Sequence, residues 1–387
     1  MIKKTNTKWL EHKLSISITQ MVVLIVLIMP ILSSCKQLTS AGDSPISNSD
    51  GRKSVILVIG DGMGHEHLRA ASFYDNGTAD GLYVQKLVPN RTITTQNASG
   101  EVTDSAASAT AMATGVKVFN GVLSVELPGD GNDLLTITEI AKNGGKSIGI
   151  VTTAHVTHAT PAAFGSHVAN RSDYESVGQD LLYRSRPDII IGGSGYGIFP
   201  DVAREAEYVV AESWNELHSM AETYLLGDRI AGLFGTGHFP YVLDRRPPRY
   251  PTLGDAATLA MSILSENPEG YVLIVEAARI DHAAHSNDVD RVVHETIELD
   301  EAVKSIMEHA SLHEDVLVLV TADHETGGLS VLEGRGTGFY PNVVWESTGH
   351  TSTEVPLFVA NPLLEEIRID SVVDNADLFS FMSGWLE

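Results

Sequence analysis

A run of small residues at 103–115, Thr-Asp-Ser-Ala-Ala-Ser-Ala-Thr-Ala-Met-Ala-Thr-Gly, contains one hydroxyl placed for nucleophilic chemistry. Ser105 lies where this run predicts the start of a helix, beside Asp104 and with no histidine or lysine close in sequence to serve as its base. The first turn of a helix offers unpaired N–H groups and a positive dipole end, which suit a phosphate. A serine becomes a good nucleophile when its pKa is lowered, and a metal ion can do this as well as a histidine. The chemistry of Ser105 therefore depends on whether the chain supplies metal ligands.

Acidic and imidazole side chains follow four apolar, β-branched runs that the sequence predicts to be strands. Asp61 follows the run 54–59, and His158 follows 147–153 together with the hydroxyl of Thr160. Glu276, Asp281 and His285 follow 271–275, and Asp323 and His324 follow 316–320. A single acid in such a place is more often a turn residue or a helix cap. In open α/β sheets, however, ligands bind at the carboxyl ends of the strands. Four strand ends rich in Asp, Glu and His therefore favour a shared metal site.

The spacing of these residues adds detail. Asp281 and His285 are four residues apart, so a helix would place both on one face, where they could hold one ion. Asp323 and His324 are adjacent and could converge on one ion where a strand meets a loop, or serve two neighbouring ions. His350 is a lone imidazole in a polar loop. Taken singly, an exposed helical pair and a surface histidine are the alternatives.

The elements that must position these residues read as alternating strands and helices. Further apolar runs at 188–191 and 355–359 predict strands, and residues 134–143, 256–266 and 292–310 predict helices. Continuous apolar strands that alternate with helices are typical of a parallel sheet covered on both faces. We therefore expect a three-layer αβα sandwich with a mainly parallel central sheet.

The N-terminus has the pattern of an export signal. Four lysines in the first 13 residues precede the apolar run 21–32, which leads to Cys35. This pattern resembles the lipobox of bacterial lipoproteins, in which the cysteine is lipidated. We expect a signal peptide over 1–34, a lipidated N-terminus and tether over 35–52, and a catalytic domain over 53–387. That organisation predicts an exported bacterial lipoprotein, anchored to a membrane on the periplasmic or extracellular side. An uncleaved membrane helix over 14–32 is the alternative.

Cysteine usage and charge exclude several classes of site. Cys35 is the only cysteine among 387 residues, so an intrachain disulfide and a zinc–thiolate site are both excluded. Any metal must be held by His, Asp, Glu and hydroxyl groups. The formal net charge of −24 argues against nucleic acid as a partner, because nucleic-acid binders need a basic surface.

Taken together, six motifs in one order resemble the alkaline phosphatase family of metal-dependent phosphomonoesterases. They are Gly-Asp-Gly-Met-Gly at 60–64, Asp-Ser-Ala-Ala-Ser-Ala-Thr-Ala at 104–111, His-Ala-Thr-Pro-Ala at 158–162, Glu-x-x-x-Ile-Asp-x-x-x-His at 276–285, Thr-Ala-Asp-His-Glu at 321–325 and Gly-His-Thr at 349–351. The resemblance extends over 54–361. It implies an alkaline-phosphatase-like fold that hydrolyses small phosphate monoesters through a phosphoserine on Ser105.

The resemblance also implies two Zn²⁺ ions, one Mg²⁺ ion and a role for each motif residue. One zinc would be held by Asp281, His285 and His350, the second by Asp61, Asp323 and His324 together with Ser105, and the magnesium by Asp61, Thr160 and Glu276. His158 would touch the magnesium through water, and Arg171 would clamp the phosphate. The chemistry of the donors agrees, because zinc accepts nitrogen and carboxylate ligands while magnesium prefers hard oxygens. An arginine fork suits two phosphate oxygens.

The chain departs from the family pattern in one segment, and alternatives stay open for two aromatic residues and for the activity. Residues 328–346 are fewer than the insertion that builds a crown in many members, so we expect a reduced crown. Its small size argues against dimer contacts through a crown and leaves a monomer and a homodimer as alternatives. Tyr340 and Trp345 would either line the site entrance or pack in the interior. The alternative activities are a phosphodiesterase of the same superfamily and a non-catalytic lipoprotein that binds zinc or phosphate. A related sulfatase fits less well, because its modified-nucleophile motif is missing from the sequence.

Overall fold

The computed structural model describes residues 52–87, 90–245, 249–312, 315–360 and 373–387. The predicted signal peptide, Cys35 and nearly all of the tether lie outside the described residues, so this division of the chain stays a prediction. Residues Ser49–Glu387 form one compact unit. Among the described residues, no helix combines the length and the apolar character needed to cross a bilayer.

A nine-stranded sheet forms the centre of this unit, with the strand order β2-β13-β8-β1-β7-β3-β4-β6-β5. Its strands are β1 (Ser54–Gly60), β2 (Asn90–Ile93), β3 (Ser147–His155), β4 (Ile189–Ser194), β5 (Val209–Ala211), β6 (Ile230–Thr236), β7 (Tyr271–Ala277), β8 (Val316–Thr321) and β13 (Val355–Ala360). All neighbours from β8 through β5 pair in parallel. At the other edge, β13 runs antiparallel to both of its neighbours, β8 and β2, so β2 has the same direction as β8. The prediction of a mainly parallel sheet is confirmed.

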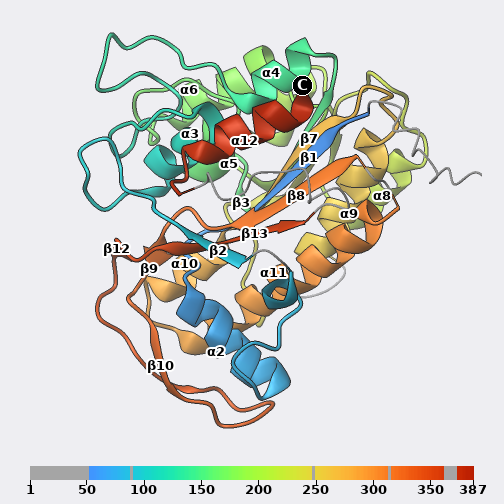
Figure 1. Ribbon diagram of the computed structural model, residues 1–387. Coiled ribbons are helices and arrows are strands. Elements are labelled where there is room, and N and C mark those ends of the chain that lie inside the picture. The colour runs from blue at the N-terminus through green and yellow to red at the C-terminus, as the bar shows by residue number, and fades with distance from the viewer. Residues whose placement is uncertain (1–51, 88–89, 246–248, 313–314, 361–372) are drawn as a thin grey trace, which may run out of the picture. The chain divides into compact units, whose positions relative to one another are not determined.

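Helices cover both faces of the sheet (Figure 1). One layer contains α3 (Ser105–Thr114), α4 (Ile137–Asn143), α5 (Ala159–Ala163), α6 (Tyr174–Gln179) and α12 (Asp377–Leu386). The other contains α2 (His65–Asn76), α8 (Trp214–Ala221), α9 (Leu253–Leu264), α10 (Arg279–Ala284) and α11 (Val289–Ala310). A helix α7 (Pro200–Glu205) packs beside β5, and η1 (Val84–Lys86) and η2 (Asp180–Ser185) are short helical turns. The three-layer αβα architecture is therefore as predicted.

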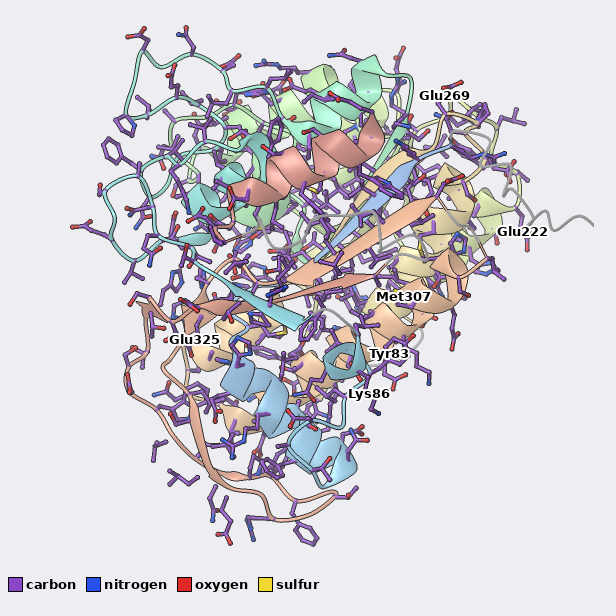
Figure 2. The ribbon with its side chains drawn as sticks, viewed as in Figure 1. Tyr83, Lys86, Glu222, Glu269, Met307 and Glu325 are labelled. Carbon is purple, nitrogen blue, oxygen red and sulfur yellow. The ribbon has the colours of Figure 1, made fainter. Side chains whose placement is uncertain are left out.

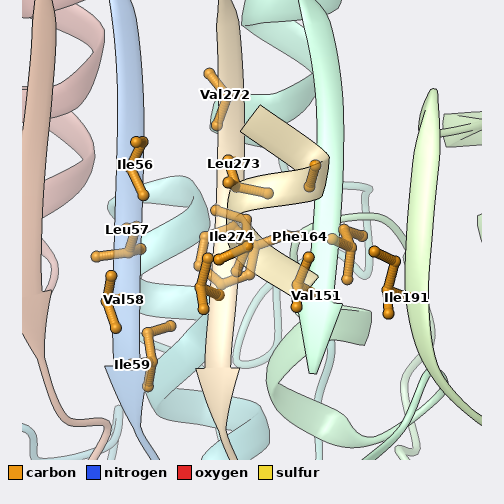
Figure 3. Close-up of a cluster of buried hydrophobic side chains, with 14 of the residues drawn as sticks. Ile56, Leu57, Val58, Ile59, Val151, Phe164, Ile191, Val272, Leu273 and Ile274 are labelled. Atoms are coloured by element: carbon orange, nitrogen blue, oxygen red, sulfur yellow. The ribbon is translucent and has the colours of Figure 1, made fainter. Parts of the chain in front are cut away.

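The core explains why the central strands are apolar throughout. Every residue of β1, β3, β7 and β8 is buried, because helices cover both faces of those strands. Figure 3 shows side chains of β1 and β7, such as Leu57 and Ile274, packed among residues of the neighbouring strands and Phe164. Burial on both faces removes the polar–apolar alternation of a half-exposed strand.

Two further small sheets lie beyond the carboxyl ends of the central strands. The pair β9 (Glu325–Thr326) and β12 (His350–Thr351) is antiparallel, as is the pair β10 (Ser330–Glu333) and β11 (Asn342–Val344). The β10–β11 hairpin occupies the place predicted for a reduced crown. Trp345 packs edge-on against His67, with ring centroids 6.1 Å apart, and Tyr340 stacks on Tyr74 at 4.6 Å. Both aromatic residues thus have the packing role that was one of the two expectations.

Candidate metal centre

The order of the central strands brings the predicted ligands to one edge. β1 lies between β8 and β7, and in register Ile59 pairs with both Thr321 and Glu276. Asp61 directly follows β1, and Asp323 is two residues beyond the end of β8. Glu276 was predicted to follow its strand, but it lies inside β7, because hydrogen bonding to β1 and β3 continues to the end of the buried segment.

Four carboxylates are buried at this edge: Asp61, Glu276, Asp281 and Asp323. Burial and the charges of Asp323, Asp281 and Glu276 raise the pKa of Asp61 well above its ordinary value. Burial raises the pKa of Asp323 to about 7, despite the hydrogen bond that Gly62 N donates to it. Such a concentration of buried negative charge needs compensation by cations.

Several polar atoms of this cluster lack a hydrogen-bond partner in the part of the chain that the structure describes. They are both carboxylate oxygens of Asp61, Oδ2 of Asp323 and the hydroxyl of Thr160. Buried polar atoms of native proteins are normally satisfied, so oxygens that converge without partners are typical of a metal site. The donor set of carboxylates, imidazoles and one hydroxyl therefore fits zinc and magnesium.

The first group of potential ligands consists of Asp61, Asp323 and His324, with ligand atoms within 4.8 Å of one another. His324 Nε2 lies 3.6 Å from Asp61 Oδ1 and 3.3 Å from Asp323 Oδ2. Asp323 Oδ1 accepts from the backbone N–H of Gly62 and from that of His324, which turns Oδ2 toward the group. These are the residues predicted for the second zinc.

The predicted ligands of the first zinc also meet, with one difference. Asp281 lies in α10, and its carboxylate is 3.2 Å from His285 Nε2 and 3.6 Å from His350 Nε2. The group whose ligand atoms all lie within 4.8 Å, however, is Asp281, His324 and His350. The rings of His324 and His350 stack at 3.5 Å, whereas those of His285 and His350 are 5.1 Å apart. His324 thus belongs to both groups.

Backbone carbonyls orient the two outer histidines. His350 Nδ1 lies 2.9 Å from the carbonyl of Thr103, and His285 Nδ1 lies 2.5 Å from that of Thr348. An N–H on Nδ1 leaves Nε2 free as a metal ligand, the usual arrangement around protein-bound metals. Both Nε2 atoms face Asp281.

The third group comprises Asp61, Glu276 and His158. His158 Nδ1 lies 3.4 Å from Glu276 Oε1 and 3.9 Å from Asp61 Oδ2. Thr160 lies two residues after His158, in α5. It contributes a buried hydroxyl without a hydrogen-bond partner among the described residues. Thr152, a residue that the sequence analysis did not single out, donates to the other oxygen of Glu276. The predicted magnesium ligands are thus neighbours, with His158 among them.

Ser105 lies at the first position of α3, as predicted, and is 3% exposed. Its Oγ is 3.3 Å from Nε2 of His324, so the hydroxyl faces the buried cluster. Asp104 caps the helix by accepting from the backbone N–H of Ala107. The small side chains of α3 are buried throughout, which explains the run of alanines.

Asp104 also holds Arg171. Its Oδ2 accepts from Arg171 Nη1 at 3.1 Å and from the backbone N–H of Gly121 at 3.0 Å. The backbone N–H of Arg171 in turn donates to the carbonyl of Gly121. The guanidinium is thereby fixed near the head of α3, where it can meet an anion that approaches Ser105.

Four histidines form a cluster beside the third group, and the sequence did not predict that their rings come together. The ring of His238 lies 4.9 Å from that of His155, 5.6 Å from that of His158 and 4.4 Å from that of His282. Burial and the nearby His158 lower the pKa of His155 to about 2 and that of His238 to about 4, so both rings are neutral. His238 follows β6, whose glycines interrupt the apolar run, so the sequence carries only a weak signal that His238 lies at the same edge of the sheet.

Comparison with known proteins adds independent information. A sequence profile described as Alkaline phosphatase matches residues 52–229 and 204–351. The chain is 33% identical to alkaline phosphatase 3 of Bacillus subtilis (strain 168) over 309 residues, which cover 76% of this chain and 65% of the relative. It is 30% identical to the human tissue-nonspecific isozyme of alkaline phosphatase over 334 residues, covering 72% and 64%. The chain therefore spans less than two thirds of the length of either relative.

Solved structures agree in fold. Alkaline phosphatase from the Antarctic bacterium TAB5 superimposes with a TM-score of 0.76 at 25% identity, covering 87% of this chain and 98% of that one. The cold-active alkaline phosphatase of a psychrophilic Shewanella species also gives 0.76, at 28% identity, covering 86% and 100%. A variant of the TAB5 protein was solved with magnesium bound in a site called M3.

Proposed function

The chain belongs to the alkaline phosphatase family, and we propose on that basis and from its site geometry that it hydrolyses phosphate monoesters to an alcohol and inorganic phosphate. The observation that carries the proposal is the position of Ser105. Its hydroxyl heads a helix, faces His324 at 3.3 Å and lies near an arginine held by Asp104. A phosphate group bound at the start of α3 would contact both the Ser105 hydroxyl, as nucleophile, and the Arg171 guanidinium, which can donate two hydrogen bonds.

In the proposed reaction, the Ser105 oxygen attacks phosphorus and the bond from phosphorus to the ester oxygen breaks. The alcohol leaves with the proton that balances the charge. Water then attacks the phosphoserine, restores the hydroxyl and releases inorganic phosphate. Arg171 donates two parallel N–H bonds to oxygens that do not react, and the N-terminal dipole of α3 favours the same anion. Asp104 keeps the arginine in place through both steps.

The residues that would hold the ions come from the three groups, with His285 beside Asp281 and Thr160 near His158 added to them. We assign two zinc ions to Asp281, His285 and His350 and to Asp61, Asp323 and His324, and one magnesium to Asp61, Thr160 and Glu276, with His158 beside it. When bound, these ions would neutralise phosphate charge and lower the pKa of the Ser105 hydroxyl. Carboxylate repulsion at Asp61 supports the assignment, since cations relieve it.

Monoesters suit the site better than diesters. A monoester has three oxygens that are not esterified, so two can meet Arg171 and the third can meet the proposed zinc ions, whereas a diester has one fewer. A related phosphodiesterase is the second candidate. Comparing the hydrolysis of an aryl phosphate with that of a bis-aryl phosphate distinguishes them, and faster turnover of the diester would refute the monoesterase.

The decisive experiment is Ser105→Ala in the metal-loaded protein. We expect phosphate release to be suppressed and the phosphoserine to vanish from acid-quenched samples examined by mass spectrometry, while zinc stays bound. Ser262→Ala, a serine on the exposed face of α9, is the matched control. Full activity in Ser105→Ala would refute the nucleophile. A wild-type protein that binds zinc but never releases phosphate would favour the non-catalytic binding lipoprotein.

We also propose that Cys35 carries a lipid and that the catalytic unit acts outside the cytoplasm. The support is the lysine-rich start and the apolar run before the only cysteine of the chain. Labelling with radioactive palmitate would mark the wild type and leave Cys35→Ser unlabelled; label on both proteins would contradict the proposal. Sedimentation velocity distinguishes the homodimer from the monomer, the two alternatives for the assembly of the chain.

A further inference from the structure

Glu325 is a buried carboxylate that belongs to none of the groups of potential metal ligands. It directly follows His324 and forms β9 with Thr326. Figure 2 shows Glu325 at the end of the sheet where Figure 1 places α10, β9 and β12. Glu325 is thus adjacent to the proposed ligand His324 without being a ligand itself, so its buried charge needs another explanation.

Both oxygens of Glu325 are used as acceptors. Oε1 accepts from the backbone N–H of Leu329 at 3.2 Å, and Oε2 accepts from that of Gly328 at 3.1 Å. Oε2 also accepts from the hydroxyl of Thr351. Three donors on one buried carboxylate make a rigid connection, since charge-assisted hydrogen bonds are the stronger ones.

The bond to Thr351 matters because Thr351 directly follows His350. The two-residue strands β9 and β12 pair His350 with Thr326 and Thr351 with Glu325. Beyond this ladder, Gly327 N donates to Gly349 O, and the backbone N–H groups of Glu346 and Ser347 donate to Gly327 O. So short a pairing has little stability of its own, and the side-chain bond from Thr351 to Glu325 reinforces it across the strands.

Glu325 also contacts the segment that follows Asp61. A Cβ added to Gly64 would lie 2.5 Å from Cγ of Glu325, so the glycine leaves space for this side chain. The ring of His67 lies 3.9 Å from Oε1. One carboxylate thus touches the segments that carry three proposed ligands: Asp61, His324 and His350.

We propose that Glu325 is a positioning residue that holds His350 at the metal centre through Thr351. This inference rests on the proposed function for the identity of the ions, and it concerns how strongly zinc is held at the position that includes His350. Loss of such an outer contact typically weakens metal binding by about 10- to 100-fold. The other proposed zinc position, which lacks His350, should change little.

Zinc affinity tests the inference without any reference to activity. Metal-free protein is titrated with zinc against a chromophoric chelator, for the wild type, Thr351→Val, Thr351→Ser and Glu325→Gln. Thr351→Val removes the hydroxyl at constant shape and should weaken one zinc by about 10- to 100-fold. Thr351→Ser keeps the donor and should restore the affinity. Ser352→Ala, at the adjacent exposed position, is the control and should match the wild type.

The absorption of cobalt in place of zinc gives a second readout, because a displaced His350 alters the ligand field of one ion only. Equal zinc affinities for Thr351→Val and Thr351→Ser would overturn the inference, as would equal weakening in Ser352→Ala. Should Glu325→Gln fail to fold, the pair at position 351 still decides the matter. A wild type that holds two zinc ions without releasing phosphate would refute the proposed function and leave the role of Glu325 intact.

Discussion

The guanidinium of Arg171 lies 3.1 Å from the carboxylate of Asp104, the residue that caps the helix carrying Ser105. One acidic side chain therefore sets the direction of the nucleophile helix and the position of the arginine. The two residues are 67 positions apart in sequence. Any movement of the arginine relative to Ser105 must break a charged hydrogen bond, so the distance between nucleophile and clamp is fixed before substrate arrives.

The first prediction concerns this clamp. Arg171→Ala should lower kcat/KM for an aryl phosphate by about 10- to 100-fold, because a hydrogen bond to a charged group contributes about 1.5–3 kcal/mol. Arg171→Lys should recover part of the loss, since it restores charge without the fork. Inhibition by inorganic phosphate should weaken in the same order.

The control for this prediction is Arg204→Lys. Arg204 pairs with Glu212 on the surface, and both side chains are about half exposed. The pair lies in α7 and the segment beside β5, so its change should leave phosphate inhibition unaltered. If Arg171→Ala bound phosphate as tightly as the wild type, the clamp would be wrongly assigned.

The second prediction concerns metal removal. Without cations, the buried charges of Asp61, Glu276, Asp281 and Asp323 repel one another, so a chelator should lower the melting temperature by several degrees. Stabilisation by a ligand at 1,000 times its Kd is about 4 kcal/mol, which sets the scale of the loss. Zinc and magnesium added back should restore the melting temperature.

The variant Asp61→Asn tests whether repulsion among the buried carboxylates, and not another effect of the chelator, lowers the melting temperature. The substitution removes one of the repelling charges, so the metal-free variant should melt above the metal-free wild type. In the presence of metals the order should reverse, because Asp61 belongs to two of the three ligand groups. A variant that is less stable in both states would contradict the repulsion argument.

The sequence predicted most of the central sheet because full burial leaves a plain signal. The run at 54–59 became β1 over Ser54–Gly60, and the run at 316–320 became β8 over Val316–Thr321. β6 was missed, since its sequence Ile-Ala-Gly-Leu-Phe-Gly-Thr breaks the apolar run with glycines. Gly232 in this strand leaves space for Leu217, whose Cδ2 would lie 2.8 Å from an added Cβ.

Helix ends and short strands were harder to foresee. The helix predicted over 292–310 begins at Val289, because the side chain of Asp288 caps it by accepting from Arg291 N. The helix predicted over 134–143 begins at Ile137, where Thr136 and Glu139 form a capping box. The β9–β12 pair gives no local signal, since two-residue strands depend on tertiary contacts. The role of Glu325 therefore could not be read from the sequence.

The third prediction concerns the pair His167 and Glu139. His167 Nε2 lies 3.1 Å from Glu139 Oε1, and its Nδ1 faces the carbonyl of Ser124. Burial lowers the pKa of His167, but the bonds to Glu139 and Ser124 outweigh it and raise the pKa above 6.5. Burial raises the pKa of Glu139, but bonds from His167 and Thr136 outweigh it and lower the pKa to about 2.

The signs of these shifts define a pH window. A histidine with a raised pKa stabilises the fold fully below 6.5 and loses that contribution as pH rises through its folded pKa. A glutamate with a lowered pKa stabilises fully above 4.5 and loses the contribution as pH falls toward about 2. The pair therefore contributes most between pH 4.5 and 6.5.

Urea unfolding of the metal-loaded protein at pH 5.5 and 8.5 checks this window. His167→Gln should cost roughly 1 kcal/mol at the lower pH and less at the higher. Arg184 also lies near this pair, with Nη2 3.9 Å from Glu139 Oε1. His218→Gln, at an exposed position in α8, should show no difference between the two pH values. An equal cost for His167→Gln at both pH values would refute the charged pair.

The last prediction concerns a buried connection between the C-terminal region and the site. Asn375 is fully buried, just before α12, and its Nδ2 donates to the hydroxyl of Ser108 at 2.7 Å. Ser108 in turn donates to the backbone carbonyl of Asp323 at 2.6 Å. Ser108, one turn beyond Ser105 in α3, thereby links the buried amide of Asn375 to the segment that follows β8.

Asn375→Ala should lower the free energy of unfolding by about 1–3 kcal/mol, because it removes hydrogen bonds in a buried place and opens a small cavity. The amide oxygen also accepts from Lys117, whose ammonium would keep its ion pair with Asp374 at 2.7 Å. The measurement is urea unfolding of the metal-free protein, so that metal affinity does not enter. Asn215→Ala, at an exposed position in α8, should change stability by less than about 0.5 kcal/mol. If the two alanine variants unfolded alike, the connection from α12 to α3 would carry no energetic weight, and the position of Ser105 would have to depend on the Asp104 cap and the packing of α3 alone.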